Sequence, residues 1–169
     1  SAREMEARVC RELTQLAMEK ARFEVRFSPT AAPDPSGGST ELWSGRGLET
    51  AEFYLSPNPG EELRPLARIA SGGELSRILL ALKSVATLDD AGKTLVFDEV
   101  DAGIGGGVAE VVGRKLKAMA AANQVLCVTH LPQIAGQADQ HLVIRKVLKA
   151  GRTTTEVRTV DGDDRVNEL

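Results

Sequence analysis

The sequence predicts an α/β fold with a mainly parallel sheet, flanking helices and an antiparallel edge. Two short apolar strands, Thr94–Phe97 and Gln124–Val128, alternate with amphipathic helices, a pattern that favours parallel pairing. Near the end of the chain, Leu142–Val147 and Thr153–Val160 flank Ala150-Gly151, which predicts a hairpin. The two helices are marked by apolar residues at helical spacing: Leu75, Ile78, Leu79, Leu82 and Val85, then Val108, Val111, Val112, Leu116 and Met119.

The first third of the chain reads differently. Residues 2–21 have apolar groups at helical spacing, and Phe23–Phe27 alternates apolar and charged residues as a half-exposed strand does. Residues 28–40 are rich in Pro, Gly, Ser and Asp and predict a loop, followed by strand-like pieces at Glu41–Trp43 and Ala51–Leu55. We therefore expect three segments: a helix over 1–22, a β-rich segment over 23–62, and an α/β lobe over 63–169 whose last residues begin a further helix.

Composition limits the class of protein. The chain has 169 residues, enough for one domain, with 42% hydrophobic residues and a net charge of −3. No apolar run approaches the roughly 20 residues of a membrane span, and the first residues lack the apolar core of a signal peptide. Cys10 and Cys127 lie far apart and suggest neither a disulfide framework nor a metal site. We expect a cytoplasmic protein that does not interact with membranes.

The first candidate site is a glycine-rich helix start. Ser71, Gly72, Gly73 and Glu74 stand immediately before an amphipathic helix. Glycines let the backbone approach a ligand, and a helix start offers unpaired N–H groups to a phosphate. Ser71 and Glu74 also fit a capping box, which needs no ligand.

Two strand ends supply the other candidates. Asp98 and Glu99 directly follow the strand Thr94–Phe97, and ligands of open parallel sheets bind at the carboxyl ends of strands. One carboxylate can hold Mg²⁺, usually through water, and the other can orient a nucleophilic water. His130 follows the next strand and can hydrogen-bond a terminal phosphate or the attacking water. A solvated acidic turn and a loop histidine are the alternatives.

The order of these elements resembles that of ABC-type ATPases. Ser71–Glu74 is similar to the signature motif, Leu95–Glu99 to the Walker B strand, Val100–Ile104 with Asp101 to the D-loop, and His130 to the switch histidine. The resemblance implies that Ser71, Gly72, Gly73, Glu74 and Asp101 contact ATP. It also implies that Asp98 holds Mg²⁺, and that Glu99 and His130 act in hydrolysis.

The detailed sequence of three longer segments resembles the RecN family of SMC-like DNA double-strand-break repair proteins. The segments are PLARIASGGELSRILLALK (65–83), FDEVDAGIGG (97–106) and QVLCVTHLPQIA (124–135), and the close match covers about residues 63–147. The resemblance implies an ATPase head that acts on DNA in the bacterial cytoplasm, at the nucleoid. Two such heads would sandwich ATP, each signature serine facing nucleotide held by the other head, and the helix over 1–22 would end a coiled coil.

One part of the ATPase pattern is missing. The chain has no Gly-x-x-x-x-Gly-Lys-[Ser/Thr] loop to cradle phosphates. In this family that Walker A loop belongs to an N-terminal lobe, which we expect as a partner. The sequence therefore predicts the C-terminal part of a head that does not hydrolyse ATP alone. Another SMC-like head and a non-catalytic dimerisation module are the alternative interpretations.

Overall fold

The computed structural model of the chain describes residues 1–29, 49–69, 72–86, 92–149 and 151–169. These residues form two units: Ser1–Ser71 with Ala81–Ala86, and Gly72–Leu80 with Thr87–Leu169. Most of the loop expected over residues 28–40 lies outside the described residues. So do Glu41–Trp43, expected to form a strand, and Ser71. In the described part of the chain, no helix is both long and apolar enough to cross a membrane.

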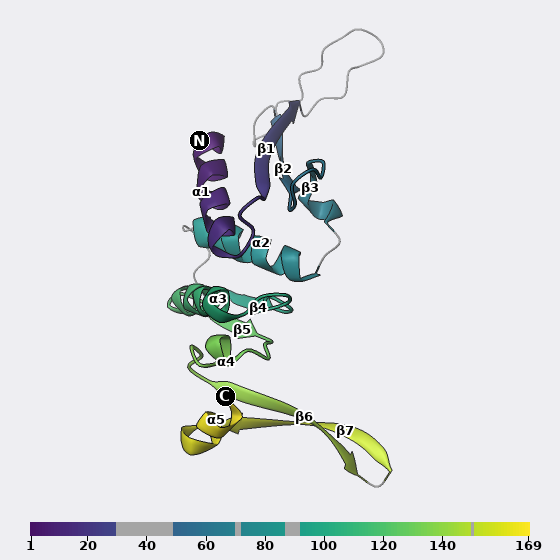
Figure 1. Ribbon diagram of the computed structural model, residues 1–169, viewed down its shortest axis with the longest axis vertical. Helices are drawn as coiled ribbons and strands as arrows, with labels where there is room; N and C mark the ends of the chain where they lie inside the picture. Colours follow the sequence, from purple (N-terminus) through teal and green to yellow (C-terminus); the bar gives the residue numbers. More distant parts are fainter. Residues whose placement is uncertain (30–48, 70–71, 87–91, 150) are drawn as a thin grey trace. The chain divides into compact units, whose positions relative to one another are not determined.

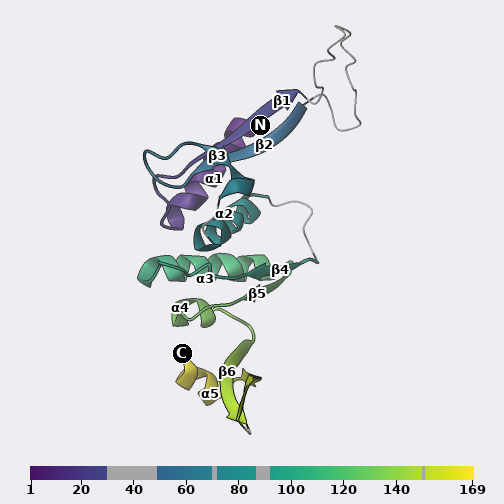
Figure 2. The same ribbon diagram turned by 90° about the vertical axis from the view of Figure 1, so that its right-hand side faces the viewer.

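The first unit packs a helix against an antiparallel sheet. Helix α1 (Ala2–Gln15) lies along β1 (Arg22–Pro29), as Figures 1 and 2 show. Strand β1 pairs along its whole length with β2 (Glu49–Ser56), which in turn pairs with the short β3 (Arg64–Pro65), followed by the 3-10 helix η1 (Leu66–Arg68). The core is made by Val9, Leu13 and Leu16, spaced along one helix face, and by Phe23 and Leu55 of the sheet.

Helix α1 ends earlier than its apolar pattern predicts. Its cap is Leu16, whose N–H donates to the Leu13 carbonyl, and Ala17 has a φ of 59°. A residue in this left-handed region cannot continue a right-handed helix, so the expected helix over 2–21 stops six residues short. The Glu6 carboxylate accepts a 2.8 Å hydrogen bond from the Val25 backbone, which joins α1 to β1.

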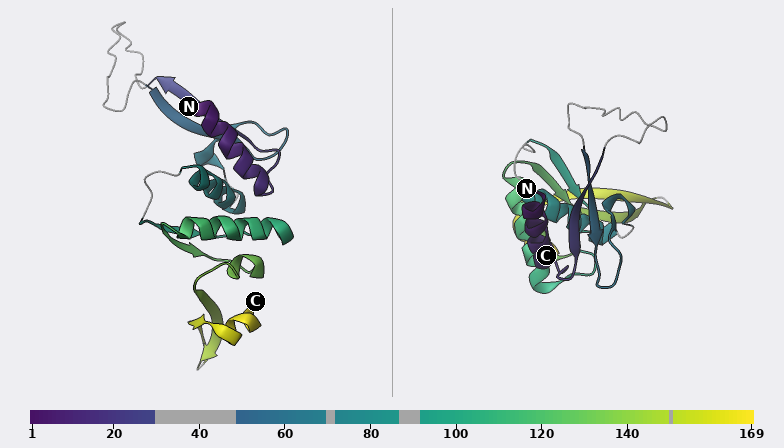
Figure 3. Two further views of the ribbon diagram at one scale, coloured as in Figure 1. Left: turned by 90° about the vertical axis from the view of Figure 1, so that its left-hand side faces the viewer. Right: turned by 90° about the horizontal axis from the view of Figure 1, so that it is seen from above.

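The second unit contains the predicted parallel pair. Strands β4 (Thr94–Phe97) and β5 (Gln124–Cys127) run in register from Thr94 opposite Gln124 to Phe97 opposite Cys127. Helix α2 (Gly72–Val85) precedes β4, α3 (Gly106–Ala120) connects the two strands, and α4 (Pro132–Ala135) follows β5. Helix α3 lies beside β5 and α4, as Figure 3 shows. The residues buried on α3 and α4 are Ala109, Val112, Gly113, Leu116 and Ile134.

The predicted hairpin is present. Strands β6 (His141–Lys149) and β7 (Arg152–Val160) pair antiparallel around Gly151, which has a φ of 77°. Helix α5 (Gly162–Glu168) follows, and its Arg165 donates hydrogen bonds to three carbonyls in the α4 region. Among the described residues β6 and β7 pair with each other and not with β4 or β5, so the antiparallel edge is a separate two-stranded sheet. The α/β class with parallel and antiparallel sheets is confirmed.

Candidate nucleotide site

The acidic and histidine-bearing segments begin at the same end of the parallel pair. Asp98 and Glu99 follow β4, and Thr129 and His130 follow β5 after one further residue. The Val128 N–H donates a 2.9 Å hydrogen bond to the Phe97 carbonyl, so the two chains stay paired beyond the strands themselves. Parallel pairing thereby brings together two sets of polar residues that are about 30 residues apart in sequence.

Glu99 occupies a sharp turn. Its φ is 56°, in the left-handed region, where backbone strain in a residue with a side chain costs on the order of 1 kcal/mol of folding free energy. The Ala102 N–H closes the turn with a 3.0 Å hydrogen bond to the Glu99 carbonyl. Backbone strain of this kind is concentrated at functional sites, because the surrounding structure must be built to hold it. The turn leaves the side chains of Asp98 and Glu99 exposed.

The start of α2 packs directly against this turn. A Cβ added to Gly72 would overlap the Glu99 carboxylate, and one added to Gly73 would lie 2.6 Å from the Ala102 Cβ and 3.0 Å from the Glu99 carbonyl oxygen. The Ser76 hydroxyl donates a 2.6 Å hydrogen bond to the Asp98 carbonyl. Close packing within one chain therefore requires a glycine at Gly73, whereas Gly72 meets only the movable end of the Glu99 side chain.

Helix α2 begins at Gly72, and this residue is next to the Glu99 side chain. The unpaired N–H groups and the positive dipole end of a helix start are favourable surroundings for a carboxylate. Proximity of Gly72 and Glu99 was not visible in the sequence, where they are 27 residues apart.

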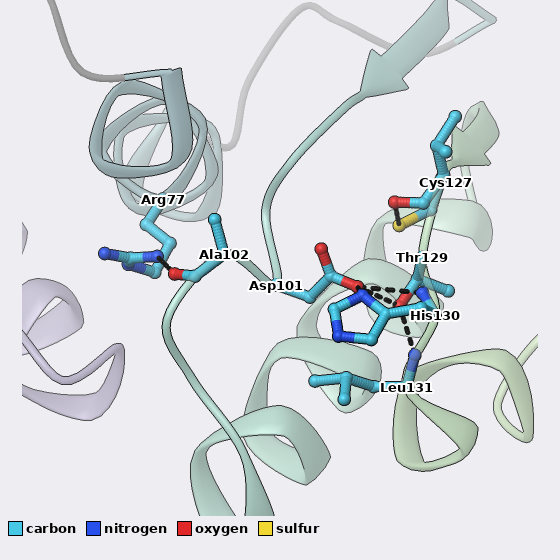
Figure 4. Close-up of polar contacts among 8 residues, drawn as sticks. Arg77, Asp101, Ala102, Cys127, Thr129, His130 and Leu131 are labelled. Carbon is cyan, nitrogen blue, oxygen red and sulfur yellow. Dashed lines mark hydrogen bonds and ion pairs between the residues drawn. The ribbon is translucent and has the colours of Figure 1, made fainter.

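Arg77 ties α2 to the same segment. Its guanidinium is buried and donates a 2.7 Å hydrogen bond to the Ala102 carbonyl, and Figure 4 shows it reaching from the helix to this carbonyl. Its Nε has no partner. Burial lowers the pKa of Arg77 from its ordinary value, and the neighbouring Glu74 partly offsets this effect. Sequence analysis did not assign Arg77 or Ser76, although both lie within one turn of the glycines.

Asp101 binds the segment that carries His130. Only 5% of Asp101 is exposed, and one carboxylate oxygen, Oδ2, accepts from the Thr129 hydroxyl at 2.6 Å and from the His130 backbone N–H at 3.0 Å. The His130 Nδ1 lies 3.0 Å from the same oxygen, as Figure 4 shows. The Thr129 hydroxyl also accepts from the Leu131 N–H. Thr129 was not singled out from the sequence, where its one signal is a polar residue directly before the histidine.

The charge of Asp101 affects its neighbours. Burial by itself would raise the pKa of Asp101, but the hydrogen bonds from Thr129 and the His130 backbone, with the adjacent imidazole, bring it below its ordinary value. The pKa of Cys127 rises to about 11, mainly through burial and further through the negative charges of Asp101 and Asp98. A thiol with such a pKa stays protonated near neutral pH and is a poor nucleophile.

The structure thus brings the sequence-predicted residues into two groups. Gly72 and Gly73 lie against Glu99, and Asp101 lies against His130. Asp98 is adjacent through its carbonyl. In the described ranges, no three His, Cys, Asp or Glu side chains gather in a way that would hold a metal ion by themselves.

The fold resembles that of solved SMC head domains. It is similar to the Smc head domain with a coiled coil and joint from Pyrococcus yayanosii, with a TM-score of 0.53, 15% identity, and coverage of 98% of this chain and 28% of that chain. It is also similar to a structure from work titled as the structural biochemistry of ATP-driven dimerisation and DNA-stimulated activation of SMC ATPases. The TM-score is 0.50 and the identity 15%, with coverage of 96% of this chain and 87% of that chain. The fold is therefore that of solved SMC head domains.

Sequence comparison identifies the particular family. The chain is 43% identical over 168 residues to the DNA repair protein RecN of Halalkalibacterium halodurans, covering 99% of this chain and 29% of the relative. The RecN of Bacillus subtilis is 40% identical with 99% and 30% coverage, and that of Streptomyces coelicolor 42% with 100% and 30%. No protein-family model matches. The chain belongs to the RecN family, corresponds to the C-terminal part of these proteins, and spans about 30% of their length.

Proposed function

We propose that this chain is the C-terminal part of an ATP-binding and ATP-hydrolysing head that acts in DNA double-strand-break repair and recombination. In this proposal the head works in the bacterial cytoplasm at the nucleoid, and its segment over 1–22 is the end of a coiled coil. Residues 23–62 form a β-rich segment, and residues 63–169 form the lobe that carries the signature, Walker B, D-loop and switch-histidine motifs. Similarity to RecN over the whole chain supports the family assignment.

The observation that carries the ATPase proposal is the shared end of β4 and β5. Asp98 and Glu99 follow one strand, His130 follows the neighbouring parallel strand, and the start of α2 packs against the turn between them. A metal-binding acid, a candidate base and a histidine able to hydrogen-bond phosphate would thus be available at one place. This combination suits a nucleotide better than it suits a purely structural module.

The acids suit Mg²⁺ that is bound together with a nucleotide. Mg²⁺ usually keeps several waters and takes one or two carboxylates plus substrate phosphates, so it does not need a cluster of protein ligands. One exposed carboxylate at Asp98, with no three-ligand group among the described residues, fits this use. Bound Mg²⁺ would neutralise developing charge on the phosphates. Glu99 would orient and deprotonate the attacking water, and His130 would hydrogen-bond the terminal phosphate.

The proposed partners complete the site. An N-terminal lobe with a Walker A loop would hold the nucleotide, because this chain has no such loop. A second head would bring Ser71, Gly72, Gly73 and Glu74 to that nucleotide in an ATP-dependent homodimer, with Asp101 near the contact. DNA would be bound by the longer protein.

The test measures ATP hydrolysis by this chain and by a two-lobed head that includes it. We expect no turnover from the chain alone. In the two-lobed head, Glu99→Gln should keep nucleotide binding, slow hydrolysis about 100-fold or more, and accumulate ATP-bound dimers. Asp98→Asn should instead weaken Mg²⁺-dependent binding. Exposed Asp139→Asn, whose charge is also removed but which lies after α4, serves as the control. Normal turnover by Glu99→Gln would refute the assignment of the base.

A further inference from the structure

We infer that Asp101 is a positioning residue for His130: its carboxylate holds the histidine ring by Nδ1 and thereby decides which ring nitrogen faces a ligand. The resemblance to ABC-type ATPases assigns Asp101 to the nucleotide contact. The geometry assigns its carboxylate to the neighbouring loop instead. The catalytic consequence of this inference rests on the proposed ATPase function, but the positioning itself does not.

Three nitrogen or oxygen groups of the neighbouring loop face one oxygen of Asp101. Oδ2 of Asp101 faces the Thr129 hydroxyl, the His130 backbone N–H and the His130 Nδ1, at 2.6, 3.0 and 3.0 Å. Asp101 is 5% exposed, whereas the His130 side chain is 76% exposed. This buried carboxylate accepts hydrogen bonds from the Thr129 hydroxyl and the His130 backbone N–H, and the His130 Nδ1 lies within ion-pair distance of the same oxygen. An exposed imidazole would otherwise sample several rotamers.

The direction of each polar contact indicates where the protons lie. The Thr129 hydroxyl accepts from the Leu131 N–H at 3.1 Å, so its own proton is free to point to Asp101. An ionised carboxylate only accepts, so the 3.0 Å contact favours the form of His130 in which Nδ1 carries the proton. In the neutral ring Nε2 is then left with a lone pair, and in the charged ring it carries a second N–H.

The chemical consequence is a defined outer nitrogen. With Nδ1–H held by Asp101, a neutral His130 offers an acceptor at Nε2, suited to a water proton. A protonated His130 offers a donor, suited to a phosphate oxygen. Without the carboxylate, the neutral ring could carry its proton on either nitrogen and rotate. Asp101 would therefore raise the turnover of the head without touching ATP.

The direct test determines the tautomer of His130 in this chain by long-range ¹⁵N–¹H NMR, at a pH where the rings are neutral and with no nucleotide. The chain has two histidines, so His141 is an internal control. We expect the Nδ1–H form of His130 to exceed the other by about tenfold or more, as a hydrogen bond to a charged acceptor allows. In Asp101→Ala this preference should be lost while the His141 signals are unchanged.

Three further variants guard against misfolding. Asp101→Asn keeps the side-chain shape and an accepting oxygen but removes the charge, and it should lower the preference several-fold. Thr129→Val keeps the shape of Thr129 but removes its hydroxyl, whereas Thr129→Ser keeps the hydroxyl; only the valine variant should reduce the preference. The inference is overturned if the parent chain shows mainly Nε2–H, or if Asp101→Asn leaves the ratio at the parent value.

A double-mutant cycle in the two-lobed head tests the consequence. Asp101→Ala should lower kcat about tenfold or more with little change in KM for ATP, and adding it to His130→Ala should change kcat by no more than about twofold. If Asp101 contacts the nucleotide itself, the two effects would multiply, which would refute its action through His130. A head with no ATPase activity but the expected tautomers would refute the proposed function and leave the positioning intact.

Discussion

Gly73→Ala tests whether the start of α2 packs so closely on the 99–102 turn that an added methyl group destabilises the fold. The added methyl would lie 2.6 Å from the Ala102 Cβ, 3.0 Å from the Glu99 carbonyl oxygen and 3.6 Å from the Arg77 guanidinium. The two nearest atoms belong to a methyl fixed on the backbone and to the backbone itself, so neither can rotate away. The helix start or the 99–102 turn would have to shift.

The magnitude follows from two opposing effects. Inserting a methyl group into a well-packed region costs about 1–3 kcal/mol. Alanine in place of glycine in a helix contributes up to about 1 kcal/mol in the other direction. Gly107→Ala reports the second effect alone, because Gly107 is likewise the second residue of its helix, α3, and an added Cβ there meets nothing within 4 Å. The propensity gain is shared by both variants, so their difference should be about 1–3 kcal/mol.

The assay is thermal and urea unfolding of the two variants and the parent, followed by circular dichroism. For a chain of this length, about 2–4 °C per kcal/mol places the midpoint of Gly73→Ala roughly 2–12 °C below that of Gly107→Ala. Gly107→Ala should equal or exceed the parent. Equal midpoints for the two alanine variants would show that α2 does not pack closely on the turn, and would remove the structural basis for the arrangement around Glu99.

Three further predictions concern single groups. Ser71→Arg in a two-lobed head should spare nucleotide binding and abolish ATP-driven dimerisation, and mixing with heads that lack the Walker A lysine should restore part of the hydrolysis; loss of binding in isolated heads would contradict action in trans. The pKa of Asp101 is lower in the folded chain than in the unfolded chain, where it is about 4. Ionised Asp101 should therefore contribute fully to the free energy of unfolding above about pH 4, and this contribution should be lost as the pH falls through the lower pKa of the folded chain. Urea titrations of the parent and Asp101→Asn should therefore converge in acid, and a constant difference between them would refute this. Cys127, with a pKa of about 11, should react slowly with iodoacetamide at pH 8. Mass spectrometry after timed labelling measures this rate, and rapid alkylation of Cys127 would contradict the raised pKa.

Much of the fold could be predicted because the spacing of apolar residues along the chain indicates helices and strands locally. The bounds of β4 match the predicted strand Thr94–Phe97, and β5 ends one residue before the predicted Val128. Helices α2 and α3 and the β6–β7 hairpin also lie where apolar spacing and the Ala150-Gly151 turn place them. The early end of α1 was missed, because Ala17 in the left-handed region has no signal in its residue type.

By itself, the sequence determined the family, the order of motifs and the chemistry available, since these depend on residue type and spacing along the chain. Only the tertiary structure decided which groups meet. The carboxylate of Glu99 lies against Gly72, and the carboxylate of Asp101 is committed to Thr129 and His130. These contacts arise because parallel pairing of β4 and β5 brings distant loops to one edge of the sheet. They depend on distance and burial in three dimensions, which motif spacing does not encode.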